Sequence, residues 1–289
     1  MRLEECLQAV RKKAPLIHCI TNYVTVNDCA NLLLAAGASP IMADEEEEVE
    51  EITSICDGLL INIGTLNRRT IPAMIKAGKK AARLGHPIVL DPVGAGASRL
   101  RTQTARQLLE EIPFTIIRGN LSELKALAGS AGVTHGVDAA QEDRITEENV
   151  QDIARFALQV SEQTGAVTVI TGPIDIVAKA GKDPEKSGVI LIRNGTPLMS
   201  RVTGTGCQLS ALIAAFAAAC PETPLEAAAA AVASMGLCGE TAEQRMQEGD
   251  GNASYRTYII DAICNLDEEQ LKAGLRAEKA AGLPEGARI

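Results

Sequence analysis

Aromatic and basic side chains are both scarce in this sequence. Its 289 residues contain no Trp, three Tyr and three Phe, and 28 Lys and Arg stand against 37 Asp and Glu, which gives a net charge of -9. A protein that binds nucleic acid normally presents a basic face with aromatic side chains for stacking. We therefore expect no nucleic-acid partner, although helix N-termini, a metal ion or arginine can still form a local anion site.

Cys-x-x-Cys pairs are also absent, although the chain contains eight cysteines. Most of these cysteines lie in apolar helical patterns, where a free cysteine packs as a small hydrophobic residue. No signal peptide is recognisable at the start of the sequence. Together these observations predict a cytoplasmic protein whose cysteines are reduced.

A long uncharged run is present, but it lacks the composition of a membrane span. Residues 202–220 include Thr, Gly, Gln and Ser, their apolar members are mainly Ala, and no cluster of Lys or Arg flanks them. A spanning helix needs about 20 predominantly apolar residues and usually has basic residues on one flank. We interpret the run as a buried helix of a soluble core, and we expect no membrane partner.

The first half of the chain alternates between short apolar runs and longer helical patterns. Strands are expected at 39–42, 59–63, 88–90 and 115–117, and helices at 27–36, 45–56, 69–84 and 99–111. Gly37 and Gly85 stand where helices commonly end. The strands are continuous apolar runs, which is typical of parallel strands covered on both faces.

The second half begins with a long helical pattern and continues with strands in quick succession. The helix is expected at 146–164, strands at 167–171, 174–178, 189–192 and 197–202, and further helices at 205–219, 225–245 and 253–265. This order predicts an α/β fold, a three-layer α/β/α sandwich whose central sheet is mostly parallel and becomes antiparallel at one edge. No linker composition interrupts it, so we predict a single domain over residues 1–289 with a mobile tail from about Asp267.

The strongest chemical signal is the segment Val202-Thr-Gly-Thr-Gly-Cys-Gln-Leu-Ser210. Gly204 and Gly206 follow a predicted strand and open the uncharged helix, so the backbone N–H groups of residues 204 to 207 can converge on an anion at the positive end of that helix. Without further context the segment also fits an ordinary glycine-rich turn before a helix, and Cys207 fits a packed apolar cysteine.

A second signal follows the predicted strand 88–90, in Leu90-Asp-Pro-Val-Gly-Ala-Gly-Ala97. Asp91 stands at the carboxyl end of a predicted parallel strand, which is where ligands bind in open α/β sheets. The alternative is that Asp91 caps the helix expected to start near Ser98.

Two further strand ends carry polar residues. Arg118-Gly-Asn-Leu-Ser-Glu-Leu124 contains Asn120 and Glu123, which suit a phosphate and metal site but also a helix cap with a capping-box glutamate. Thr171 ends the predicted strand 167–171, and by itself it is a weak signal because Thr-Gly-Pro is a common strand exit.

These segments, in this order, resemble the signature of ribokinase-like kinases. In those proteins Gly-x-Gly-Asp opens the helix beneath the transferred phosphate, and the Asp receives the proton of the substrate hydroxyl. Cys207 stands at that position here, which is characteristic of the hydroxyethylthiazole kinase family. Pro15-Leu-Ile-His-Cys-Ile-Thr-Asn22 and Gly37-Ala-Ser-Pro-Ile-Met42 resemble the same family, and the resemblance extends from about residue 15 to residue 265.

The resemblance implies ATP-dependent phosphorylation of the hydroxyl of 4-methyl-5-(2-hydroxyethyl)thiazole, in thiamine biosynthesis or salvage. It implies a site whose residues fall into four groups. Catalysis is assigned to Cys207, Gly204, Thr205 and Gly206. Contacts with ATP are assigned to Arg118, Asn120 and Thr171, and Mg²⁺ to Asp91 and, through water, Glu123. The thiazole pocket is assigned to Asn22, Met42 and Gly204, although Met42 also suits simple core filling.

The resemblance also implies a homotrimer with its active sites between subunits. Three alternatives stay open. The chain could be a kinase of the same fold for hydroxymethylpyrimidine or a sugar, against which Asn22 and Met42 argue. It could be an ATP-dependent dehydratase of nicotinamide hydrates, which keeps an Asp where Cys207 stands. It could also be a non-catalytic nucleotide-binding or redox-sensing protein, against which the complete phosphate and metal loops argue.

Overall fold

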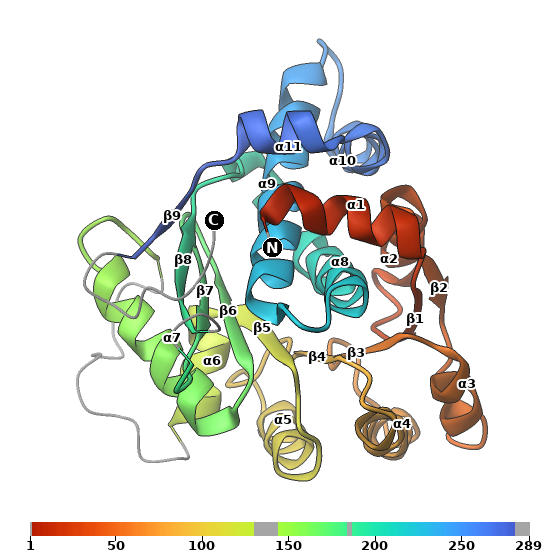
Figure 1. The fold of residues 1–289 in the computed structure, drawn as a ribbon. Coiled ribbons are helices and arrows are strands. Elements are labelled where there is room, and N and C mark those ends of the chain that lie inside the picture. Colours follow the sequence, from red (N-terminus) through yellow and green to blue (C-terminus); the bar gives the residue numbers. More distant parts are fainter. Residues whose placement is uncertain (1, 130–143, 184–186, 281–289) are drawn as a thin grey trace.

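The computed structural model describes residues 2–129, 144–183 and 187–280, whose strands form one sheet with helices on both faces (Figure 1). The strand order is β2-β1-β3-β4-β5-β6-β7-β8-β9. The predicted three-layer α/β/α sandwich is therefore confirmed.

Six consecutive positions of the sheet are parallel. They are β1 (Leu16–Ile20), β2 (Ser39–Ile41), β3 (Gly58–Asn62), β4 (Ile88–Asp91), β5 (Ile116–Asn120) and β6 (Val167–Thr171). The other strands, β7 (Asp175–Lys179), β8 (Gly188–Ile192) and β9 (Ala277–Lys279), continue the sheet in antiparallel pairing. Every residue of β3 and β4 is buried, which explains why these runs carry no polar alternation.

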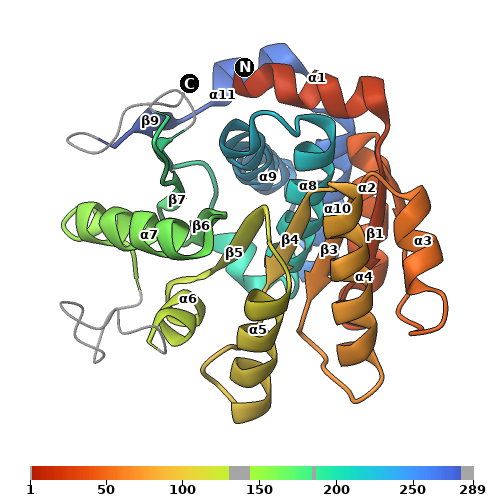
Figure 2. The ribbon, with the colours of Figure 1, turned by 60° about the horizontal axis from the view of Figure 1, so that its bottom comes forward.

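The helices divide between two hydrophobic clusters, one on each face of the sheet (Figure 2). One face is covered by α1 (Leu3–Lys13), α2 (Val26–Ala36), α8 (Thr205–Ala219), α9 (Pro224–Arg245), α10 (Asn252–Asn265) and α11 (Glu268–Gly274). The other is covered by α3 (Val49–Ile55), α4 (Thr70–Leu84), α5 (Arg99–Glu111), α6 (Leu121–Ala128) and α7 (Val150–Thr164).

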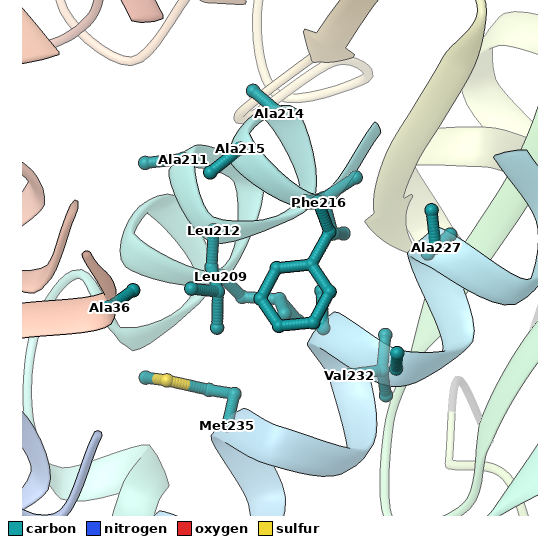
Figure 3. Close-up of a cluster of buried hydrophobic side chains, with 14 of the residues drawn as sticks. Ala36, Leu209, Ala211, Leu212, Ala214, Ala215, Phe216, Ala227, Val232 and Met235 are labelled. Carbon is teal, nitrogen blue, oxygen red and sulfur yellow. The ribbon is translucent and has the colours of Figure 1, made fainter. Parts of the chain in front are cut away.

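Helix α8 lies at the centre of the first cluster, because it packs on β3 and β4 and is covered by α2 and α9. All its residues from Cys207 to Ala218 are buried, which confirms the predicted buried helix. The ring of Phe216 lies between α8 and α9, near Val232 and Met235 (Figure 3). Across the described residues, no helix combines the length and apolarity that crossing a membrane requires.

Two expectations are wrong. Residues 197–202 form no strand: Pro197–Arg201 is a 3-10 helix (η2) with no buried residue, capped by Thr196, whose side chain accepts from the backbone of Leu198. The tail up to residue 280 is also ordered into α11 and β9, because Leu271 is fully buried and β9 pairs with β8. Helix α1 and strand β1 lie outside the predicted elements, and residues 281–289 lie outside the described ones.

Candidate active site

The carboxyl ends of the parallel strands meet at one edge of the sheet, where α8 begins. Asn62 of β3 is in register with Asp91 of β4, and Asn120 of β5 with Thr171 of β6. Parallel strands all exit at the same edge, so motifs far apart in the sequence converge here. The structure thus brings together four of the predicted segments.

The first turn of α8 has the geometry of an anion site. Gly204 is its N-cap with a φ of +85°, and an added Cβ would lie 2.1 Å from Cγ2 of Thr25. The first helical hydrogen bond runs from Gln208 N–H to the Gly204 carbonyl. The preceding N–H groups therefore have no partner inside the helix and point out of its positive end.

Arg118 lies directly over this turn. A Cβ on Gly206 would come within 2.5 Å of Nη1 of Arg118, so only glycine lets the guanidinium approach the backbone. The guanidinium donates from Nη2 to Oγ1 of Thr171 at 2.7 Å, and its Nη1 lies 3.6 Å from Oδ2 of Asp91. Arg118 and Thr171, two of the three residues predicted to contact ATP, are therefore joined to each other beside the start of α8.

Asp91 is fully buried, and its two oxygens have different surroundings. Oδ2 accepts from Ser210 Oγ at 2.7 Å and from Asn62 Nδ2 at 2.9 Å, while Oδ1 is buried without a hydrogen-bond partner among the described residues. Burial raises the pKa of Asp91 to about 6, although Arg118 and the bond from Ser210 oppose the shift. The alternative that Asp91 caps the helix near Ser98 is wrong, because Ser98 itself is the N-cap of α5.

Asn120 and Glu123 form a capping box at the start of α6. Glu123 N–H donates to Oδ1 of Asn120 at 2.8 Å, and Asn120 N–H donates to Oε2 of Glu123 at 2.9 Å. The other oxygen of Glu123, Oε1, accepts from Gly94 N–H at 2.8 Å, which ties the loop after Asp91 to α6. The helix-cap interpretation is therefore confirmed for both residues.

The residues present suit Mg²⁺ only in part. The described residues contain no group of three or more His, Cys, Asp and Glu side chains able to enclose a metal. The unpartnered Oδ1 of Asp91 is nevertheless a buried carboxylate oxygen, and each oxygen of Glu123 keeps a second acceptor position. Such a donor set fits an ion that retains several waters and binds through nucleotide phosphates, as Mg²⁺ commonly does.

Asn22 connects Cys207 to the rest of the site. Its Nδ2 donates to Sγ of Cys207 at 3.2 Å and to Oδ1 of Asn62 at 3.0 Å. Burial and the nearby Asp91 raise the pKa of the Cys207 thiol, whereas hydrogen bonds from Asn62, Asn22 and Thr25 oppose that shift. The thiol is consequently protonated near neutral pH.

Met42 and His18 belong to the β2 and β1 side of the sheet. Met42 follows β2 and lies half-buried against the hydrophobic cluster that contains Cys207. His18 is buried in β1, with Nδ1 2.9 Å from Oγ1 of Thr53 and Nε2 2.8 Å from the carbonyl of Ala43, so it has a structural role.

Three polar residues of the site were not predicted. Asn62 ends the strand before Asp91 and shares the signal that pointed to Asp91, a polar side chain at the end of an apolar run. Ser210 carries no comparable signal, because a serine inside a helix usually bonds within that helix. Arg101 donates to the carbonyl oxygens of Ile63, Gly64 and Val93, and only the folded chain brings these loops together.

A mostly parallel α/β/α sandwich with a glycine-led helix start at the carboxyl edge of its sheet is the fold of the ribokinase-like class. The model of the Hydroxyethylthiazole kinase family matches residues 7–269. A hydroxyethylthiazole kinase of Clostridium acetobutylicum is 57% identical over 276 residues, which cover 96% of this chain and 99% of that protein. The chain therefore belongs to the Hydroxyethylthiazole kinase family.

Other relatives agree. A hydroxyethylthiazole kinase of Desulfovibrio desulfuricans is 46% identical over 95% of this chain and 96% of its own length. The solved structure of the hydroxyethylthiazole kinase protein from Pyrococcus horikoshii OT3 has a TM-score of 0.84 and 33% identity, and the match covers 96% of this chain and 98% of that one. A Bacillus subtilis NAD(P)H-hydrate dehydratase, with a TM-score of 0.56 and 15% identity, shares the fold alone.

Proposed function

We propose that this chain transfers the γ-phosphate of ATP to the hydroxyl of 4-methyl-5-(2-hydroxyethyl)thiazole, in thiamine biosynthesis or salvage. The observation that carries the proposal is the set of side chains that meet at the start of α8. Asn22 donates to Cys207 of this turn, and Arg118, which is bonded to Thr171, lies against Gly206 of the same turn. Relatives that match almost the whole chain carry the name of this activity.

In this mechanism the chain acts mainly by positioning. The N–H groups of residues 204 to 207 hold the transferring phosphate, and the guanidinium of Arg118 supports its charge from above Gly206. The thiazole ring lies between Asn22 and Met42, whose flexible, polarizable thioether suits an apolar sulfur-containing ring. This arrangement sets the alcohol in line with the phosphate, which supplies most of the rate in phosphoryl transfer.

Cys207 orients the alcohol in this mechanism. Since its thiol is protonated near neutral pH, it accepts a hydrogen bond from the substrate hydroxyl without first removing the proton. Asn22 donates to the same sulfur and so holds it in place. A loose phosphoryl-transfer transition state places little demand on a base, because the hydroxyl loses its proton late, to an oxygen of the phosphate that it has attacked.

Mg²⁺ would be held by Oδ1 of Asp91 and, through water, by Glu123. When bound, it neutralises charge on the ATP phosphates. The fixed orientation of both carboxylates follows from Asn62, Ser210 and the capping box.

The native assembly would be a cytoplasmic homotrimer of single-domain chains, with active sites between subunits. Tyr23 and Val24 directly follow Asn22 and are 76% and 59% exposed, and Leu34 of the adjoining α2 is 58% exposed. Apolar side chains beside the alcohol pocket suit a subunit boundary there. Sedimentation equilibrium would give a mass three times that of the chain, and a monomer that remains fully active would reject this assembly.

The proposed reaction can be tested by measuring ADP release with a panel of acceptors. Purified protein with Mg²⁺ and ATP would be offered the thiazole alcohol, hydroxymethylpyrimidine, a sugar and a hydrated nicotinamide nucleotide. We expect ADP and a phosphorylated thiazole, identified by mass spectrometry, with the first acceptor alone. Turnover of another acceptor, with none of the thiazole alcohol, would replace the proposed substrate.

A further inference from the structure

Asn62 occupies the centre of the polar cluster, yet the proposed mechanism gives it no step of its own. It ends β3, is 1% exposed, and donates to Asp91 at 2.9 Å while accepting from Asn22 at 3.0 Å. It is therefore the side chain that joins the alcohol side of the site to the metal side.

Two backbone N–H groups determine the orientation of the side-chain amides of Asn62 and Asn22. Gly64 N–H donates to Oδ1 of Asn62 at 2.9 Å, and Thr25 N–H donates to Oδ1 of Asn22 at 3.2 Å. A backbone N–H can only donate, so each of these amides must turn its oxygen towards it. The NH₂ group of Asn62 consequently faces Asp91, and a flipped amide would set that group against two donors.

The carboxylate of Asp91 is held through one oxygen. Asn62 of β3 and Ser210 of α8 both donate to Oδ2. The ion pair between Asp91 and Arg118 is made through the same oxygen, which lies 3.6 Å from Nη1 of Arg118. Oδ1 receives no bond from any described residue although it is buried. An unpaired buried carboxylate oxygen is costly, so a ligand for it is expected.

We propose that Asn62 is a positioning residue, which holds Oδ2 of Asp91 so that Oδ1 is presented to the divalent cation of the bound nucleotide. The inference rests on the proposed function for the identity of that ligand. Ser210 assists from α8, and since α8 also binds the phosphate, cation and phosphate are placed by one rigid element. Asn22 and Gly64 act indirectly, because they hold the amide of Asn62 in its orientation.

The test is the variant Asn62→Asp, which has nearly the same shape. Its carboxylate still accepts from Gly64 and Asn22, but it sets an oxygen instead of an NH₂ group against Oδ2 of Asp91. Changes in groups that orient a metal ligand commonly cost 10- to 100-fold in metal affinity or activity. We therefore expect kcat to fall by about 10- to 100-fold and the Mg²⁺ concentration for half-maximal rate to rise by about tenfold, with the KM for the thiazole alcohol within about threefold.

Two further variants separate positioning from folding. Ser210→Ala removes the second donor to the same oxygen and should change the Mg²⁺ requirement in the same direction. Asn149→Asp makes the same exchange in the loop before α7, where Oδ1 accepts from Thr146 N–H, and it should leave all constants unchanged. Thermal unfolding of each variant shows whether the fold is retained.

A direct binding measurement completes the test. Calorimetric titration of Mg²⁺ into protein saturated with a non-hydrolysable ATP analogue should show weaker binding for Asn62→Asp and Ser210→Ala than for the parent. Unchanged Mg²⁺ binding in both variants, or equal losses of metal and alcohol affinity, would overturn the proposal. If the parent does not phosphorylate the thiazole alcohol, the proposed function fails, while this titration still decides the role of Asn62.

Discussion

At the scale of single residues, the site combines two acidic groups that burial keeps from ionising easily. The pKa values of Asp91 and Cys207 are both raised by burial, and each is opposed by hydrogen bonds from neighbouring amides and hydroxyls. These hydrogen bonds do not remove the free-energy cost of burying the two groups. They determine which atom of each group remains free to contact a ligand. For Asp91 that atom is Oδ1, and for Cys207 it is a protonated sulfur bonded to Asn22.

Replacing Cys207 tests whether the thiol has a chemical role. Cys207→Ala should bind both ligands as the parent does but lower kcat by up to about 100-fold, because the alcohol loses the group that orients it towards the phosphate. Cys207→Asp should keep or raise kcat, because a carboxylate accepts the Asn22 bond and is also a competent base. Steady-state kinetics with both substrates give these constants, and an alanine variant as fast as the parent would remove the thiol from the chemistry.

At the scale of elements, the start of α8 depends on a backbone conformation that only glycine adopts without strain. Gly204 has a φ of +85° and faces Thr25, whereas Gly85 has a φ of +71° at the end of α4 with nothing within 4 Å of its Cβ position. The two glycines therefore share the left-handed conformation and differ in the space around it.

This difference gives a matched pair of variants. Gly85→Ala should lower the free energy of unfolding by about 1–2 kcal/mol, the cost of a left-handed alanine. Gly204→Ala should cost more, because the methyl group also meets buried Thr25, and it should abolish phosphate binding. Adding Thr25→Ser removes the clashing methyl and should recover part of the stability measured by urea unfolding. Equal costs for the two glycines would show that the close approach of Thr25 to Gly204 does not constrain the start of α8.

Strand β1 is joined to the segment around α3 through His18. The Ala43 carbonyl can only accept, so Nε2 of His18 carries the hydrogen, and Nδ1 lies 2.9 Å from Oγ1 of Thr53. Burial lowers the pKa of His18 below its ordinary value of 6.5. The folded state therefore holds His18 neutral at pH values where the unfolded chain already binds a proton.

The sign of the pH effect follows from this difference. The contribution of His18 to stability is fully present above the unfolded pKa of about 6.5 and is lost as the pH falls through the lower folded pKa. Urea unfolding of the parent should show stability falling below about pH 6.5. His18→Gln, which cannot titrate, should show a smaller decrease over the same range, and parallel curves would exclude His18 as a cause.

At the scale of the whole molecule, the C-terminal segment completes the sheet and the helical layer. Leu271 of α11 is fully buried, Arg276 donates to Glu240 of α9 at 2.7 Å, and β9 covers the edge of β8. These contacts couple residues 267–280 to the face that contains α8.

Shortening the chain tests this coupling. A chain ending at Leu266 should be less stable and should aggregate, because it exposes the edge of β8. The single change Leu271→Ala should cost about 2–5 kcal/mol, as is usual for a buried leucine. A chain ending at Ala280 keeps every contact described for this segment and serves as the control. If the chain ending at Leu266, the Leu271→Ala variant and the chain ending at Ala280 unfold at the same midpoint, α11 and β9 contribute nothing to stability.

Much of the fold was predictable, because its signals are local. Strands β3 and β4 are continuous apolar runs, and Gly37 and Gly85, at the ends of α2 and α4, adopt the left-handed conformation expected of them. Residues 197–202 misled because their apolar side chains suggest a strand, whereas Pro197 and the cap from Thr196 favour a turn of 3-10 helix. The tail misled because its charges conceal Leu271.

The sequence alone determined the layered α/β architecture, the glycine-dependent start of α8 and the family to which the chain belongs, since periodicity, backbone conformation and motif order are properties of neighbouring residues. Only the tertiary structure decided that Arg118 lies over Gly206, that Ser210 bonds Asp91, and that Asn62 faces its NH₂ group towards the same carboxylate. The reason is that these bonds join residues from separate strands and helices, and their direction depends on which donors the folded chain places opposite each acceptor.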